Sequence, residues 1–135
     1  MSAETIVADA IANVPKAVAA GVVDLESGLM LAIETAQSHP QKILDILAPA
    51  TRELFEGEMV SSIENLFKQA RGVQSDEHYF QELLISSTHL WHFFGRLKAN
   101  PKVVVTVVTT TDVNLGMLLV KCRELTGKGV LRGSS

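Results

Sequence analysis

Four histidines are the first residues to weigh for chemistry, because histidine can bind a metal or act as a general acid or base. His89 and His92 lie three residues apart. In an extended strand this spacing points the two side chains to opposite faces, so the pair cannot chelate one ion. His78 follows Asp76 and Glu77, which is typical of a solvated loop. The histidines therefore predict no metal site.

The other residues that could do chemistry form no catalytic motif. The nine glycines make neither a G-x-G-x-x-G nor a Walker sequence, and no serine lies in a G-x-S-x-G elbow. Glu53, Glu56 and Glu58 form an acidic cluster that is most simply the solvated face of a helix. The single cysteine, Cys122, lies on an apolar stripe and is expected to be a small buried residue. We expect no enzyme, no cofactor and no metal.

Composition gives no indication of nucleic acid or membrane as a partner. The formal net charge is −3, and Trp91, Phe93 and Phe94 lack the interleaved basic residues that accompany base stacking. We expect these aromatic rings in the core. The chain opens without a signal peptide and carries no run of 18 apolar residues, so the expected location is the cytoplasm.

The strand at Lys102–Thr110 and the helix after it indicate how the other elements must be arranged. The strand is apolar on both alternating faces, so helices must cover both sides of its sheet. Asp112 and Asn114 are good N-cap residues for the helix, and Gly116 in its first turn is expected where another element crosses closely. The apolar side of the helix carries Leu115, Leu118, Leu119, Cys122 and Leu125.

The remaining elements alternate in a simple order. A helix at Ser2–Val14 is stopped by Pro15, and a strand of small residues at Ala17–Asp24 turns through Leu25–Gly28 into a strand at Leu29–Ile33. A loop at Ala36–Pro40 precedes a long helix, Gln41–Arg71, which Gly72 closes. Strands at Tyr79–Ser86 and Leu90–Leu97 follow, with the reversal at Ser86–His89. The order predicts one α+β domain over residues 1–128, with a five-stranded, mostly antiparallel sheet in a three-layer α/β/α arrangement, and a flexible tail at 129–135.

The long helix has two apolar stripes about 150° apart. One carries Ile43, Leu47, Ala50 and Leu54, and the other carries Phe55, Met59, Ile63, Leu66 and Ala70. Pro49 or Gly57 could break the helix and redirect its faces. Alternatively, one stripe faces the sheet and the other a partner chain. The sequence leaves both interpretations open.

Two segments resemble the Roadblock / dynein light-chain family, in its bacterial GTPase-regulator type. Asp112-Val-Asn-Leu-Gly116 and the helix after it are similar to the family's C-terminal signature, D-x-N-x-G after a central strand. Val22-Val-Asp-Leu-Glu-Ser-Gly28 resembles its first hairpin, and the order of elements agrees over residues 3–127. The resemblance implies a Roadblock/profilin-like sheet ordered 2-1-5-4-3, with the long helix on one face and the terminal helices on the other.

The resemblance also implies a function. Members of the family are non-enzymatic, and bacterial ones activate or scaffold small Ras-like GTPases. They form homodimers through the third strand and the long helix, which would cover the otherwise open edge of the third strand. The expected interface residues are Phe80, Glu82, Leu84, Ile85, Phe55, Met59, Ile63 and Leu66. A scaffold of the same fold without a GTPase, or a small-ligand sensor using the His78–His92 region, are the alternatives.

Overall fold

The fold was established with a computed structural model, which describes residues 2–35, 41–75 and 78–128, and only the backbone of residues 41–45 and 128. The expected loop at 36–40, the tail at 129–135, the acidic pair at 76–77 and the Ile43 side chain therefore lie outside the described residues. Among the helices that are described, none is both long and apolar enough to cross a membrane.

The described elements follow the predicted order, with one additional helix. They are α1 (Ala3–Asn13), β1 (Ala17–Asp24), β2 (Leu29–Thr35), α2 (Gln41–Glu56), α3 (Glu58–Arg71), β3 (Glu82–Ser86), β4 (Leu90–Arg96), β5 (Val103–Thr110) and α4 (Leu115–Lys128). The strands form one antiparallel sheet in the order β2-β1-β5-β4-β3. The predicted fold class and strand order are confirmed.

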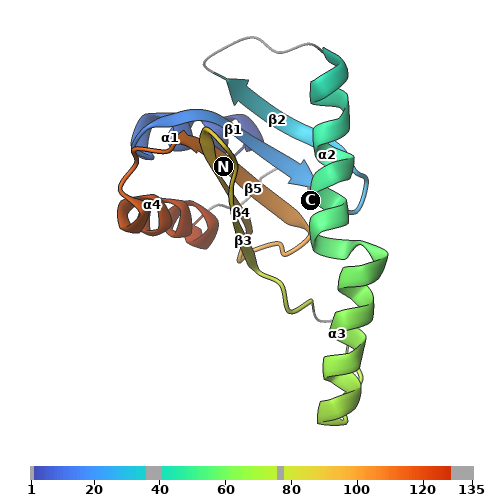
Figure 1. Ribbon diagram of the computed structural model, residues 1–135. Helices are drawn as coiled ribbons and strands as arrows, with labels where there is room; N and C mark the ends of the chain where they lie inside the picture. Colours follow the sequence, from blue (N-terminus) through green and yellow to red (C-terminus); the bar gives the residue numbers. More distant parts are fainter. Residues whose placement is uncertain (1, 36–40, 76–77, 129–135) are drawn as a thin grey trace.

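Helices lie on both faces of this sheet. Figure 1 shows α1 and α4 on one side and α2 on the other, whereas α3 extends beyond the end of the sheet. On β5, Val105 and Val107 pack in the core under α1 and α4, and Val104 packs with Phe55 in the core under α2. The strand apolar on both faces is thus the middle strand, as its pattern predicts.

The turn between β1 and β2 is fixed by its own polar side chains. The Asp24 carboxylate accepts hydrogen bonds from the Glu26 backbone N–H at 3.1 Å and from the Ser27 hydroxyl at 2.8 Å. Gly28 has φ +73°, a left-handed conformation that glycine adopts without steric cost. An aspartate at the end of a strand, followed by a left-handed glycine, therefore determines this hairpin locally.

The long helical pattern is two helices, and the break is at Gly57. Gly57 is extended (φ −62°, ψ 163°) and is the N-cap of α3. A Cβ there would lie 2.5 Å from the Glu53 carbonyl oxygen, so a side chain cannot be accommodated without movement of the backbone. Pro49, the other predicted break, lies inside α2 on an exposed position, where water can replace a lost backbone hydrogen bond.

We predict that the Cys122 thiol is unreactive in the folded protein. The residue is fully buried on the inner side of α4, and burial, followed by the charge of Glu82, raises the pKa of the thiol to about 12. At pH 8 an aromatic disulfide reagent should modify the native protein at least 100-fold more slowly than the protein in denaturant, where one equivalent should react at once. Equal rates in the two conditions would contradict the burial.

Candidate protein–protein interface

Glu64 is the most deeply buried carboxylate among the described residues, and it lies on α3, outside the sheet. Only 2% of it is exposed. Its carboxylate accepts hydrogen bonds from the backbone N–H groups of Tyr79 and Phe80 and contacts His78 Nδ1 at 3.0 Å. Burial alone raises the pKa of Glu64, but hydrogen bonds from His78, Tyr79 and Phe80 outweigh it and hold the pKa below its usual 4.5. The charged side chain therefore anchors α3 to the segment that leads into β3.

Glu56, the last residue of α2, extends this polar cluster toward the sheet. Its Oε2 lies 3.6 Å from His78 Nε2, 3.7 Å from Arg96 Nη1 and 3.3 Å from Lys102 Nζ. The side chain of Glu56 is only 13% exposed. The expectation of a solvated acidic face is therefore wrong at Glu56, and the expectation of a solvated loop is wrong at His78, which lies between two carboxylates.

Arg96, at the end of β4, completes the cluster. Its Nε donates to the Phe80 carbonyl and its Nη1 to the Pro101 carbonyl, both at 2.7 Å, and its Nη2 donates to the Phe55 carbonyl at 3.4 Å. Burial lowers the pKa of Arg96, and the charges of Glu56 and Glu64 offset part of that effect. We call Glu56, Glu64, His78 and Arg96 the buried ion cluster, with the exposed Lys102 at its edge.

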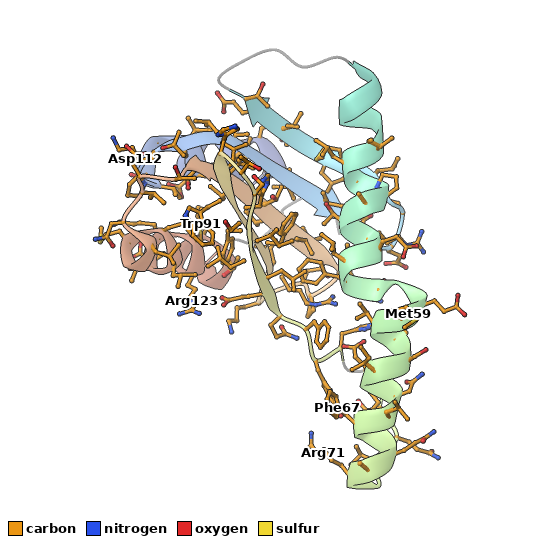
Figure 2. All side chains as sticks on the ribbon, in the orientation of Figure 1. Met59, Phe67, Arg71, Trp91, Asp112 and Arg123 are labelled. Atoms are coloured by element: carbon orange, nitrogen blue, oxygen red, sulfur yellow. The ribbon has the colours of Figure 1, made fainter. Side chains whose placement is uncertain are left out.

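The side of α3 that carries Glu64 makes further contacts with the segment before β3. The Phe67 ring lies 6.4 Å from the Tyr79 ring, and the charged ends of Lys68 and Arg71 lie 5.8 and 5.9 Å from it. Figure 2 shows Phe67 and Arg71 reaching toward this segment. We call Glu64, Phe67, Lys68 and Arg71 the anchored side of α3.

A second side of α3 is apolar and exposed. Met59 is 75% exposed, Ile63 is 40% exposed and Leu66 is 64% exposed. Ala70, also exposed, continues the same row. Single exposed apolar residues are common, but a row of them on one helix is typical of a contact surface. The two interpretations of the long helix are thus compatible. The helix is broken, and the part that follows the break carries the second apolar face.

The strand β3 is an edge strand whose two faces are unequally covered. Leu83 lies opposite Phe94 and packs in the core under α2, whereas Leu84 lies opposite Phe93 on the other face. Leu84 is 36% exposed and Ile85 is 38% exposed. Since β3 ends the strand order among the described residues, its outer edge is available to another strand.

Two of the expected interface residues, Phe55 and Phe80, are placed differently, and a third, Glu82, has an ion pair within the chain. Phe55 is fully buried in the core under α2, so it cannot touch a partner. Phe80 precedes β3, because Glu64 and Arg96 bind its backbone and draw it out of the strand. Glu82 is on β3, but both its carboxylate oxygens accept hydrogen bonds from Arg123 of α4, at 2.9–3.2 Å. The strand that was expected to begin at Tyr79 therefore begins three residues later, at Glu82.

The three residues predicted to form the cap of the last helix, Asp112, Asn114 and Gly116, have different roles in the structure. Asn114 Oδ1 accepts a hydrogen bond from the Met117 backbone N–H at 3.0 Å, as an N-cap residue does. Asp112 does not cap α4: it bonds to the Thr110 hydroxyl and lies 3.4 Å from Lys16 Nζ. Among the residues that the structure describes, no other element crosses Gly116: outside the backbone of its own helix, only Asn114 Oδ1 lies within 4 Å of a Cβ placed there, at 3.4 Å. The expectation of a close crossing is wrong.

The expected His78–His92 region is not one site. His92 Nε2 lies 3.0 Å from the Ser87 hydroxyl, and burial lowers the pKa of His92. His92 lines an apolar cavity of about 140 Å³ between α2 and the sheet, bordered by the small residues of β1. These small residues mark a central strand, as predicted, but they leave space under α2. No cluster of three or more potential metal ligands occurs in the part of the chain that the structure describes.

Sequence reasoning missed the buried ion cluster. One signal for it was present, since Arg96 follows a strand of bulky apolar residues and precedes Leu97. A charged residue in such a run indicates a buried partner. Nothing in the local pattern names Glu56 and Glu64 as those partners, because they lie 40 and 32 residues earlier in the chain.

Comparisons with known proteins support the fold of this chain, but they give no close relative in sequence. In sequence, the chain matches no family model and no curated protein. In structure it is similar to "MglB with tetrameric arrangement", with a TM-score of 0.67 and 16% identity over 90% of this chain and 80% of that one. It is also similar to the gliding protein MglB of Thermus thermophilus, with a TM-score of 0.65 and 16% identity over 90% of this chain and 81% of that one.

A third solved structure gives the fold its name. The Roadblock/LC7 domain from Streptomyces avermitilis aligns with a TM-score of 0.65 and 13% identity, over 93% of this chain and 92% of that one. The chain has the Roadblock fold. The fold resemblance expected from the two sequence segments is thus confirmed across nearly the whole chain.

We predict that Glu64→Gln destabilises the folded chain by about 1–3 kcal/mol at pH 7, because a charged acceptor of backbone N–H groups is replaced. The pKa of Glu64 is lowered in the folded state, so its contribution is complete above pH 4.5 and is lost as pH falls below that value. Urea unfolding at pH 7 and pH 3.5 measures both effects.

The control for this experiment is Glu124→Gln. Glu124 is exposed on α4 and pairs only loosely with Lys121, at 3.8 Å, so its replacement should change stability by less than about 0.5 kcal/mol. A Glu64→Gln variant as stable as this control at pH 7 would show that the cluster does not hold α3.

Proposed function

We propose that this chain is a non-enzymatic regulator of a small Ras-like GTPase and that it works as a homodimer. The observation that carries the proposal is the Roadblock fold combined with exposed apolar residues on β3 and α3. The resemblance implies a protein that acts through such surfaces rather than through a catalytic site. The structural likeness to MglB proteins agrees with a regulatory role.

The dimer contact that we propose is the β3 edge. Two copies related by a two-fold axis would pair their β3 strands and join the two sheets. Leu84 and Ile85 project to opposite faces of β3, so pairing would cover apolar surface on both faces. Arg123 holds Glu82 at the start of the strand, which keeps that carboxylate away from a partner strand.

The GTPase contact would act without a catalytic arginine. Among the exposed arginines that the structure describes, Arg123 is committed to Glu82, Arg71 lies against Tyr79, and Arg52 of α2 lies beside Gly28 of the β1–β2 turn. An effect on hydrolysis would therefore come from positioning the GTPase's own switch loops. The exposed apolar row of α3 is a second surface beside the sheet.

We expect Leu84→Glu to halve the mass of the particle in light scattering. A carboxylate in the paired strand would be buried against apolar residues, at a cost of about 2 kcal/mol or more. The matched control is Leu29→Glu, on the opposite edge strand, where the leucine is 62% exposed. An unchanged mass for the Leu84 variant, or a native protein that is already a single chain of 14.6 kDa, would refute the β3 dimer.

The GTPase link is tested with purified small Ras-like GTPases from the same genome. Each is loaded with GDP or with a non-hydrolysable GTP analogue and titrated with the dimer. We expect one of them to bind at least tenfold more tightly in one nucleotide state, and its hydrolysis rate to change. If a folded dimer binds none of them in either state, the scaffold function of the same fold replaces this proposal.

A further inference from the structure

The space between α2 and the sheet is filled at one end and hollow at the other. Phe55 of α2 and Phe94 of β4 pack edge to face, with ring centroids 6.5 Å apart, and fill the end near the helix break. Toward the start of α2, a cavity of about 140 Å³ separates Leu47 and Thr51 of the helix from the small residues of β1. Protein interiors hold few voids larger than a water molecule, because a void loses packing contacts. An occupant of matching shape would recover those contacts.

The small residues of β1 create this cavity. Gly21 faces it, since a Cβ placed there would lie 3.1 Å from Thr106 Cγ2 and 3.3 Å from Met30 Sδ, and both of these residues line the cavity. Side chains two residues apart on a strand share a face, so Ala19 points to the same side of the sheet. These two positions of β1 together supply one methyl group where larger apolar side chains would fill the space.

The wall of the cavity is apolar, and two of its polar groups have partners within the chain. The Thr51 hydroxyl donates to the Leu47 carbonyl at 2.8 Å. His92 Nε2 lies 3.0 Å from the Ser87 hydroxyl, and burial lowers the pKa of His92, which favours its neutral form. Apart from this histidine, none of the described lining residues has an acidic or basic side chain. A charged molecule would therefore be buried there without a partner, which is costly.

The volume and the wall favour one chemical class of occupant. An engineered apolar cavity of about 150 Å³ stays dry and binds benzene, so the cavity under α2 has the size of a single six-membered ring. Phe94 offers an aromatic ring and Met30 a thioether, and both make favourable contacts with an aromatic molecule.

We propose that the cavity under α2 is a binding site for a small, neutral molecule with one aromatic ring. The ring would contact Leu47 from the helix and Ala19 and Phe94 from the sheet, and so join α2 to the sheet. All these residues belong to one chain. The site therefore depends neither on the β3 dimer nor on a GTPase, and its failure would leave the proposed function standing.

Benzene is the probe that tests the site. At about ten times its dissociation constant, benzene should raise the thermal unfolding midpoint by about 4 °C or more. In methyl NMR spectra its ring current should shift the signals of Ala19, Leu47 and Val108, which line the cavity, but not that of Leu118 in the core under α1 and α4. Benzoate, which is charged, should raise the midpoint by less than 1 °C. No rise at the solubility limit of benzene, an equal rise with benzoate, or methyl shifts confined to the other core would overturn the proposal.

Two variants that fill the cavity locate the binding. Ala19→Leu fills it from the sheet, and Leu47→Phe fills it from the helix, at a position that is 37% exposed and so tolerates a larger side chain. Each should weaken benzene binding at least tenfold in calorimetric titration. The matched control, Ala50→Leu, adds the same side chain at an exposed position of α2 and should bind benzene as the native protein does. Native affinity in a filling variant that is folded by circular dichroism would overturn the proposal.

Discussion

The buried ion cluster is the interaction on which the positions of α3 and β3 both depend. A buried charge is stable only when other charges or hydrogen-bond donors surround it. Glu64 receives backbone N–H groups from the segment before β3, and Arg96 donates to carbonyls of the same segment and of α2. The cluster thus connects the helix break, the start of the edge strand and the β4–β5 loop. Moving any one of these elements would leave a charge without its partner.

This requirement explains features that apolar packing does not. α3 extends beyond the sheet and so cannot be held by the main cores, which lie under α1, α4 and α2. It is held by charge and by the aromatic contact of Phe67 with Tyr79. Its outer side is then free to carry Met59, Ile63 and Leu66 without unfolding the domain. A helix held by polar contacts on one side can present apolar residues on the other.

The rest of the domain follows from a central strand with two apolar faces. Because β5 must be covered on both sides, the helices divide between the two faces, and the sheet grows outward to β2 and β3 as its edges. The interaction surfaces that we propose are both at the periphery of this arrangement. The Roadblock fold thus supplies the central sheet, and the surfaces that we propose for recognition are an edge strand and a helix that the sheet does not cover.

The sequence alone determined the elements whose cause is local. Val103–Thr110 alternates apolar residues on two faces, Asp24 and Gly28 fix a turn within five residues, and Asn114 caps the helix that follows it. Of the residues predicted for an interface, Leu84, Ile85, Met59, Ile63 and Leu66 are exposed, whereas Phe55 is buried and Phe80 is outside the strand. The tertiary structure decided the break at Gly57, the start of β3 and the fate of Glu56, Glu64 and His78. These features depend on contacts between residues that are distant in the chain. The way in which the sheet and helices come together decides which partner a buried charge has, and no local sequence pattern encodes that partner.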